Sequence, residues 1–358
     1  MTGARQAVVL AGGKGTRLRP LTNARPKPLL PVLGRPCVEY VIEAMAEAGV
    51  EEVFLTCGYR AQDMVDALGS GQRFGVDIIM CLEDTPAGTA GAVKLLEDRL
   101  DGTFVVASGD VLADVDVRSL VEQHEKRGAM ATMALTTVER PEEFGIVGLD
   151  SSGRVERFKE KPPTEEVFSN LINAGIYVLE RDVLPEIPSG EMYDFSKQLF
   201  PKLLAADQPL YGSELGGLWK DIGRPRDLLD ANIQMAERRG RRIEMDGAEC
   251  SGRIVADRFT AHGCRIDGPA YIGDDVSIGR GARLSSCAVG ANAIISEGVA
   301  LTGSFLMDGC SLGTGCQVYG SLLGNDVEIG DGAILTDCVL GDGVRVMSGE
   351  SLEGRTLD

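Results

Sequence analysis

The sequence predicts an α/β domain with a mostly parallel sheet over residues 1–240, followed by a hexad-repeat parallel β-helix over residues 241–358. Three observations carry this prediction. Short β-rich runs alternate with amphipathic helical patterns, a charged helical stretch follows, and small apolar residues then recur every five or six positions to the end. A chain of 358 residues is long enough for two domains that each bury a core.

The strands expected in the first part are short runs of β-branched and other apolar residues. They lie at 7–10, 53–56, 77–80, 104–107 and 130–135. Helical periodicity is expected at 36–48, at 61–68 and in the charged link at 225–242. Because sites of open parallel sheets lie at the carboxyl ends of the strands, the loops after Leu10, after Ala107 and near Trp219 should converge.

The hexad pattern runs from Ile266 to Leu352 in steps of six residues that are interrupted by steps of five. It predicts coils with three short sides, in which each aliphatic residue points inward and stacks on the next coil. Cysteine and serine at matching positions, Cys287, Ser304, Ser321 and Cys338, are expected to be small buried fillers.

Every 17 residues, a shortened step carries a second apolar residue beside the inward one. These residues form a stripe: Ala288, Phe305, Leu322 and Val339. If the inward residue fills the core, its neighbour points outward, so the stripe predicts a subunit or interdomain contact. We expect a homo-oligomer that associates through Phe305, Leu322 and Val339. The alternative is that the shortened side bends and buries both residues locally.

Composition excludes several classes of function. A net charge of −18 opposes affinity for nucleic acid, so no nucleic-acid partner is expected. The sequence shows no charged leader and no long apolar segment, which predicts a cytoplasmic protein without membrane association. Nine cysteines without a Cys-x-x-Cys pair, and only two histidines, argue against a zinc site and a disulfide framework. His124, in a charged helical stretch, is expected at the surface.

The stretch from Gly12 to Val38 is basic and contains no acid, although the whole chain is acidic. This contrast predicts a triphosphate site. Gly12, Gly13 and Gly15 follow a strand and would let backbone N–H groups approach phosphate oxygens closely. The order of residues is neither that of a P-loop nor that of a dinucleotide fingerprint.

The run from Gly12 to Thr22 with Pro26-Lys27-Pro28 resembles the signature of the nucleotide-sugar pyrophosphorylase family, the sugar-1-phosphate nucleotidylyltransferases. The likeness continues, in family order, through Gly88-Thr89-Ala90-Gly91, Ser108-Gly109-Asp110, Phe144-Gly145, Glu160-Lys161-Pro162, Asn173-Ala174-Gly175 and Trp219-Lys220-Asp221. It implies a Rossmann-like nucleotidyltransferase domain with a left-handed β-helix. It also implies that a nucleoside triphosphate and a sugar-1-phosphate react with Mg²⁺ as cofactor, releasing pyrophosphate.

The resemblance also implies roles for individual residues. Arg17 would hold the triphosphate and stabilise the leaving pyrophosphate, while Lys27 would bridge the reacting phosphates. Asp110 and Asp221 would bind Mg²⁺. The nucleotide would contact Leu10, Ala11, Gly12, Gly13, Gly15, Thr16, Glu83, Gly88 and Thr89. The sugar phosphate would contact Gly145, Glu160, Lys161 and Asn173.

Glu83 bears on the nucleobase. A carboxylate matches the two adjacent donors of guanine, whereas an amide suits uracil better. With the Gly-Thr-Ala-Gly loop, this favours a likeness to mannose-1-phosphate guanylyltransferases. A uridylyl- or thymidylyltransferase acting on glucose-1-phosphate is the alternative. Two other classes remain open: a β-helix acetyltransferase with His262 as base, and a silent regulatory homologue, which retention of Arg17, Lys27, Asp110 and Asp221 disfavours.

Overall fold

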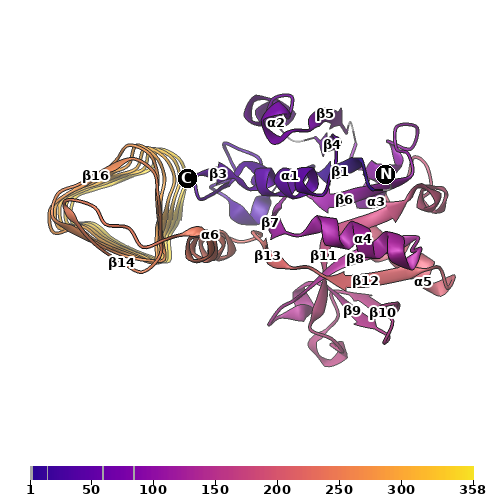
Figure 1. Cartoon of the computed structure of the whole chain (residues 1–358). Helices are drawn as coiled ribbons and strands as arrows, with labels where there is room; N and C mark the ends of the chain where they lie inside the picture. Colours follow the sequence, from indigo (N-terminus) through magenta and orange to yellow (C-terminus); the bar gives the residue numbers. More distant parts are fainter. Residues whose placement is uncertain (1–2, 14, 59, 84) are drawn as a thin grey trace. The chain divides into compact units, whose positions relative to one another are not determined.

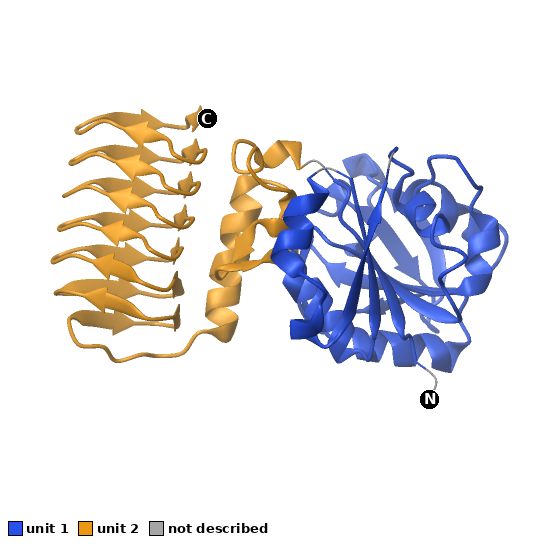
Figure 2. Cartoon of the chain, turned by 90° about the horizontal axis from the view of Figure 1, so that it is seen from above, with its two compact units in different colours: residues 1–13, 38–219 blue, residues 14–37, 220–358 orange. Residues whose placement is uncertain are grey.

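The computed structural model describes residues 3–13, 15–58, 60–83 and 85–358. The chain forms two compact units: unit 1 comprises residues 1–13 and 38–219, and unit 2 comprises residues 14–37 and 220–358 (Figure 2). The boundary expected at residue 240 coincides with the end of helix α6, Pro225–Arg239, but α6 itself belongs to unit 2. Unit 2 therefore holds the β-helix together with α6 and the basic segment 14–37.

Unit 1 contains one large sheet in the order β10-β9-β11-β6-β1-β4-β5, with β8 beside β11 and β12 beside β8. The strands are β1 Gln6–Leu10, β4 Glu52–Cys57, β5 Asp77–Leu82, β6 Thr103–Ser108, β8 Ala131–Thr137, β9 Gly145–Leu149, β10 Val155–Glu160, β11 Leu171–Glu180 and β12 Leu210–Glu214. All five strands expected from the sequence are confirmed.

The sheet is mixed rather than mostly parallel. Strands β6, β1, β4 and β5 run parallel, but β11 is antiparallel to β6, β8 and β9, and β10 is antiparallel to β9. For β9 and β10 the cause is the short connection between them, since parallel neighbours need a crossover of a dozen or more residues. Only residues 150–154 join β9 to β10, which permits a hairpin and nothing else.

Among the residues that the structure describes, five helices accompany this sheet, and Figure 1 labels each of them. They are α1 Cys37–Glu47, α2 Ala61–Leu68, α3 Thr89–Lys94, α4 Val117–Arg127 and α5 Phe200–Ala205. The helices predicted at 36–48 and 61–68 are confirmed. The buried residues of α3 and α5 belong to a core in which Tyr177, Phe195 and Phe200 pack ring against ring. In the part of the chain that is described, no helix is both long and apolar enough to cross a bilayer.

The β-helix of unit 2 consists of three parallel sheets, seen end-on as a triangle in Figure 1 and from the side in Figure 2. The first sheet has β14 Ala248–Ser251, β17 Cys264–Asp267, β20 Arg283–Ser285, β23 Ala300–Thr302, β26 Gln317–Tyr319, β29 Ile334–Thr336 and β32 Ser351–Glu353. The second has β15 Ile254–Ala256, β18 Ala270–Ile272, β21 Ala288–Val289, β24 Phe305–Leu306, β27 Leu322–Leu323, β30 Val339–Leu340 and β33 Thr356–Leu357. The third has β16 Phe259–Ala261, β19 Val276–Ile278, β22 Ile294–Ile295, β25 Ser311–Leu312, β28 Glu328–Ile329 and β31 Arg345–Val346.

The hexad residues fill the core of these coils, as predicted. From Ile266 to Val346 they are buried, and Leu352 packs against them from a partly buried position. The column of Cys287, Ser304, Ser321 and Cys338 is fully buried, which confirms these residues as fillers. The backbone N–H of Cys338 donates to Ser321 Oγ at 3.0 Å, and that of Ser321 donates to Ser304 Oγ at 3.1 Å. This column thus adds hydrogen bonds between successive coils.

The apolar stripe is covered by the same chain. It lies on the second sheet, where strand register adds Tyr271 below Ala288, Phe305 and Leu322. Phe305 is only 2 % exposed and Leu322 only 3 % exposed. Helix α6 packs on the lower strands of this sheet, and Arg25 reaches Met307 and Asp342 beside the upper ones. Ala288, Phe305 and Leu322 therefore make a contact within the chain, which was one of the two expected uses of the stripe, and they do not join copies of the chain. Val339, the fourth residue of the stripe, is half-buried.

His124 is buried, contrary to the surface position expected from its charged neighbours. It shares one face of α4 with Val117, Leu120 and Val121, and the helical spacing of these four residues directs the ring inward. Its Nδ1 lies 2.9 Å from Thr132 Oγ1 and its Nε2 lies 3.1 Å from Glu180 Oε1. The sequence contained this signal, but the flanking charges masked it.

Burial of His124 makes the stability of unit 1 dependent on pH. Burial lowers the pKa of His124, against the opposing effect of Glu180. In the unfolded chain the histidine pKa is about 6.5. As the pH falls through this value, the unfolded chain therefore binds a proton at His124 more readily than the folded chain does. We expect the free energy of unfolding to fall as pH drops from 7 to 5, and to fall less in the His124→Gln variant. Urea unfolding at pH 5, 6 and 7 would measure both, and equal falls would contradict the assignment.

Candidate active site

Three parallel strands of unit 1 end together and place their loops at one edge of the sheet. In the strand register, Leu10 at the end of β1 is paired with Thr56 of β4 and with Ser108 of β6. The N–H of Ala11 donates to the Thr56 carbonyl at 2.9 Å, and that of Gly109 donates to the Leu10 carbonyl at 2.8 Å. These bonds fix the glycine-rich loop after Leu10 beside the loop that carries Asp110.

A pocket of about 280 Å³ opens at this edge. It is lined by Leu10, Ala11, Gly12, Gly13, Thr56, Glu83, Pro86, Gly88, Thr89, Ala92, Ser108, Asp110 and Asp194. The lining thus brings together most of the predicted nucleotide residues with one predicted metal ligand, all within unit 1. Gly15 and Thr16, also predicted to bind nucleotide, belong to unit 2.

The Glu83 carboxylate faces the glycine-rich loop. Its Oε1 would lie 3.4 Å from a Cβ atom placed on Gly12, and its Oε2 accepts a long hydrogen bond of 3.4 Å from the Ala87 N–H. The Glu83 backbone N–H donates to the Cys57 carbonyl at 3.0 Å, so the residue is tied to the end of β4. Its carboxylate therefore stands in the pocket with hydrogen-bonding capacity left for a ligand.

Gly88 is required by the loop that follows. Its φ is +76°, and a Cβ there would lie 2.7 Å from the carbonyl oxygen of Tyr193. The Tyr193 N–H donates to the Ala87 carbonyl at 2.9 Å, so the two segments brace each other. The Thr89 hydroxyl lies 3.2 Å from Asp194 Oδ1 and accepts from the Phe195 N–H at 3.0 Å. Thr89 thus holds the loop together as well as lining the pocket.

The predicted nucleotide residues did not include three polar residues of the lining: Thr56, Asp194 and Ser108, which was named only within the Ser108-Gly109-Asp110 motif. Thr56 is 2 % exposed, and its hydroxyl oxygen has no hydrogen-bond partner among the described residues. A buried polar group without a partner costs about 1–3 kcal/mol, and a bound ligand could satisfy it. The only signal in the sequence was its place at the end of a predicted strand. Asp194 could not be found, because chain folding alone brings it to Thr89.

The residues predicted for the sugar phosphate also meet within unit 1. Glu160 at the end of β10 is paired with Gly145 at the start of β9, and a Cβ on Gly145 would lie 2.6 Å from Glu160 Oε2. Burial raises the pKa of the Glu160 carboxyl, against the opposing charges of Lys161 and Lys197. Lys161 has a φ of +44° and follows directly with an exposed side chain.

Asn173 belongs to the same cluster. Its Nδ2 donates to Tyr177 Oη at 3.0 Å and to Ser196 Oγ at 3.2 Å, while its Oδ1 accepts from the Gly175 N–H at 2.9 Å. Burial raises the pKa of Tyr177 to about 12, so its hydroxyl stays protonated. The Asn173 amide is therefore held in one orientation beside Glu160, as a sugar-hydroxyl contact needs.

Unit 2 brings together the two predicted catalytic residues and the second predicted metal ligand. Lys27, with a side chain only 7 % exposed, places Nζ 3.2 Å from Asp221 Oδ1. A Cβ on Gly223 would lie 2.7 Å from Asp221 Oδ2 and 2.8 Å from Arg17 Nη2, so this glycine leaves room for both side chains. Gly15 similarly leaves room for the Lys27 stem, which would lie 2.9 Å from its Cβ.

Asp221 lies near a second carboxyl group, that of Asp227. Burial, and then the negative charge of Asp221, raises the pKa of the nearby Asp227 carboxyl. The described residues contain no group of three or more His, Cys, Asp or Glu side chains suited to a metal. Mg²⁺ needs no such group, since it is usually bound through one or two carboxylates, substrate phosphates and water. Asp110 in unit 1 and Asp221 in unit 2 are donors of this type.

The Nucleotidyl transferase family matches residues 6–238, and the EIF2B subunit epsilon LbH domain matches residues 255–352. The chain belongs to the nucleotidyl transferase family. The predicted enzyme class and the predicted α/β domain with a left-handed β-helix are thereby confirmed. A UTP–glucose-1-phosphate uridylyltransferase of Synechocystis is 33 % identical, over 85 % of this chain and 83 % of that protein. A mannose-1-phosphate guanylyltransferase of Mycobacterium tuberculosis is 35 % identical, over 84 % of this chain and 82 % of that protein.

Among solved structures, one from Bacillus anthracis, assigned as a glucose-1-phosphate thymidylyltransferase and solved in complex with a sucrose, is similar to this chain. It has a TM-score of 0.59 and 29 % identity, and the match covers 64 % of this chain and 94 % of that one. The relatives named here are sugar-1-phosphate nucleotidyltransferases that differ in nucleobase and sugar. Reaction class and substrate are therefore separate questions for this chain.

Proposed function

We propose that the enzyme transfers a guanylyl group from GTP to mannose-1-phosphate, yielding GDP-mannose and pyrophosphate. The position of Glu83 carries this choice. Its carboxylate lines the pocket opposite Gly12, and in the described part of the chain its partner is the weakly bonded Ala87 N–H. A free carboxylate complements the two adjacent donors of guanine. The guanylyltransferase relative of Mycobacterium tuberculosis supports the same choice.

Transfer of uridylyl or thymidylyl to glucose-1-phosphate is the second candidate. The Synechocystis uridylyltransferase matches over the same share of the chain at nearly the same identity. The two candidates differ in the hydrogen bonds that the base demands, because uracil and thymine present one donor flanked by acceptors. The ionised Glu83 carboxylate has no hydrogen to donate, so it could not bond to those acceptors of uracil or thymine.

The chemistry requires positioning and charge neutralisation more than acid–base catalysis. An oxygen of the sugar phosphate, already anionic at neutral pH, bonds to the α-phosphorus, and the bond from that phosphorus to the β-phosphate oxygen breaks. Pyrophosphate leaves with the electron pair. In this proposal the backbone N–H groups of Gly12 and Gly13 approach phosphate oxygens, Arg17 neutralises the leaving pyrophosphate and Lys27 bridges the reacting phosphates.

Asp110 and Asp221 are the proposed magnesium ligands. The ion would neutralise charge on the phosphates. At the sugar-phosphate site, the Glu160 carboxylate would accept hydrogen bonds from sugar hydroxyls, and the Asn173 amide would donate or accept them. The Gly145 backbone would also bond to a sugar hydroxyl. Lys161 would form an ion pair with the sugar phosphate. The close pairing of Gly145 with Glu160 supports a shared site for these residues.

A matrix of pyrophosphate release tests this function. GTP, UTP, dTTP, ATP and CTP are each combined with mannose-, glucose- and N-acetylglucosamine-1-phosphate in the presence of Mg²⁺. We expect the highest kcat/KM for GTP with mannose-1-phosphate. A higher value for UTP or dTTP with glucose-1-phosphate would establish the second candidate, and background rates for every pair would refute the enzyme assignment.

Glu83→Gln provides a sharper test of the base assignment. Hydrogen bonds to a charged group are worth about 1.5–3 kcal/mol, so kcat/KM for GTP should fall about 10- to 100-fold. The value for UTP should rise or stay constant, because the amide offers a donor to the base. Glu97→Gln is the matched control, since Glu97 pairs with Lys94 at 2.7 Å and is not among the residues that line the pocket. An equal loss for GTP and UTP in Glu83→Gln would contradict a contact with the base.

Two further expectations from the sequence stay predictions: a cytoplasmic location and self-association. Burial of Phe305 and Leu322 within unit 2 removes the stripe as the contact between copies. Any association must therefore rest on residues other than Phe305 and Leu322. Sedimentation velocity of the full chain over a hundredfold concentration range would measure it directly.

A further inference from the structure

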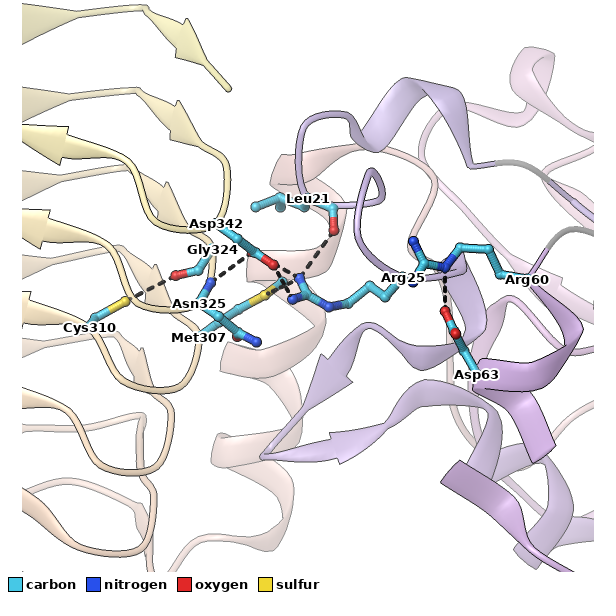
Figure 3. Close-up of polar contacts among 9 residues, drawn as sticks. All are labelled: Leu21, Arg25, Arg60, Asp63, Met307, Cys310, Gly324, Asn325 and Asp342. Atoms are coloured by element: carbon cyan, nitrogen blue, oxygen red, sulfur yellow. Dashed lines mark hydrogen bonds and ion pairs between the residues drawn. The ribbon is translucent and has the colours of Figure 1, made fainter. Parts of the chain in front are cut away.

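The signature segment, residues 14–37, carries Arg17 and Lys27 and belongs to the same compact unit as the β-helix. Two side chains of the segment bond to the β-helix: Asn23 Nδ2 donates to Asp358 Oδ2 at 2.6 Å, and Arg25 pairs with Asp342. Arg25 Nη2 lies 2.5 Å from Asp342 Oδ2, and Arg25 Nη1 lies 3.2 Å from Asp342 Oδ1 (Figure 3). The same Nη1 donates to the Leu21 carbonyl at 3.2 Å and contacts Met307 Sδ at 3.2 Å. Arg25 thus joins the segment's own backbone to the β-helix.

A hydrogen bond within the β-helix also holds the Asp342 carboxylate. Asp342 Oδ1 accepts from the Asn325 N–H at 2.9 Å, across one coil of the β-helix. The turn at Gly324 and Asn325 is held by a second hydrogen bond, because the Cys310 thiol donates to the Gly324 carbonyl at 3.1 Å (Figure 3). The side chains of Arg25 and Asp342 are only 16 % and 29 % exposed, so solvent screens this pair less than an open surface pair.

The connection from Arg25 to Lys27 is short and stiff. Pro26 lies between them with φ −69° and ψ 150°, and Pro28 follows, so the backbone at this point has little freedom to absorb a displacement. Lys27 in turn packs against Gly15, whose carbonyl accepts from the Thr22 hydroxyl at 2.9 Å. A shift of Arg25 would therefore move the Lys27 ammonium relative to Asp221.

We infer that Arg25 and Asp342 are positioning residues through which the β-helix sets the placement of Lys27 for catalysis. The inference rests on the proposed function, because it assigns importance to the exact position of Lys27. Misplacement of a reacting group by about 1 Å can cost on the order of 100-fold in rate. The β-helix then contributes to the rate without touching a substrate.

The chain offers a matched control. Asp331 accepts from the Thr314 N–H at 2.7 Å, one coil apart, in the same way that Asp342 accepts from the Asn325 N–H. Each aspartate follows a glycine, and each amide donor follows a glycine. Asparagine at either position keeps Oδ1 as the acceptor of the turn hydrogen bond, while a neutral NH₂ group replaces Oδ2 and the negative charge is lost. The two substitutions differ in the ion pair with Arg25, which Asp342 alone makes.

The test compares Asp342→Asn, Arg25→Ala, the double variant and Asp331→Asn in the full chain. We expect kcat to fall about tenfold in the first two with KM values and melting temperature unchanged, and the double variant to fall no further. Asp331→Asn should retain wild-type kcat. Hydrogen exchange in a peptide covering residues 15–30 should speed up in Asp342→Asn but not in Asp331→Asn.

The exchange measurement needs no substrate, so it separates this inference from the proposed function. If no substrate pair reacts but exchange rises as expected, the proposed function fails and the anchoring of the segment stands. Unchanged exchange in Asp342→Asn would overturn the inference. So would an unchanged kcat in that variant, an equal loss in Asp331→Asn, or additive losses in the double variant.

Discussion

Replacement of Lys27 by methionine will lower kcat about a thousandfold, the loss typical for removal of one group that neutralises charge in the transition state. Methionine keeps the apolar stem that packs beside Gly15 and removes only the ammonium. Because the Lys27 side chain is 7 % exposed and lies 3.2 Å from Asp221, the charge acts in a partly desolvated site where electrostatic effects are strong. Pyrophosphate release at saturating substrates measures the loss.

Lys202→Met is the control for this variant. Lys202 also pairs with a carboxylate, Glu186 at 2.8 Å, but its side chain is 48 % exposed and it lies outside the predicted site. It should keep wild-type kcat. If Lys27→Met retained more than a tenth of the wild-type rate while folding normally, Lys27 could not bridge the reacting phosphates.

Removal of the proposed magnesium ligands will have the second largest effect. Asp110→Asn and Asp221→Asn should each lower activity at physiological Mg²⁺ by about 100-fold or more, since charge neutralisation by a bound ion is worth several kcal/mol. Each should also raise the Mg²⁺ concentration required for half-maximal rate. Asp221→Asn additionally removes the partner of Lys27, so its loss should exceed that of Asp110→Asn.

Magnesium titrations of pyrophosphate release will measure these changes. Asp230→Asn is the control, because Asp230 is a carboxylate of α6 that pairs with Arg226 at 3.5 Å and with Lys220 at 3.7 Å. Its magnesium dependence should match that of the wild type. Normal pyrophosphate release by an Asp110→Ala/Asp221→Ala double variant would refute the metal assignment.

The fold was predictable wherever a single periodicity governed a stretch of chain. The hexads from Ile266 to Val346 are buried as expected because one inward residue per side is the only way such short strands can close a core. The later strands of unit 1 were less predictable. Their pairing depends on connection length and on which neighbour is free, so the antiparallel half of the sheet did not follow from strand patterns.

Candidate site residues could be proposed from the sequence where the residue type alone, such as glycine or a charged residue, suggests the role. Gly12 and Gly88 were expected to allow close approach to the backbone, and Lys27 and Asp221 were expected to supply charge. The structure places Gly12 and Gly88 in the pocket lining and Lys27 beside Asp221. Residues that depend on distant partners were not predictable. Arg25 lies in the basic stretch from Gly12 to Val38 that predicted a triphosphate site, yet it binds Asp342, more than 300 positions away. Asp194 and Thr56 entered the lining in the same way, through contacts that no local spacing encodes.

Residues 14–37 are encoded near the start of the chain but belong with its final third. A chimera of two relatives that is joined at residue 240 would therefore separate residues 14–37 from the unit to which they belong. A chimera of that kind would give the signature segment a foreign coil in place of the turn that carries Asp342, and Phe305 and Leu322 would be replaced along with it. A functional chimera would need residues 14–37 and α6 to come from the same parent as the β-helix. The segments that must be exchanged together are therefore not contiguous in the gene.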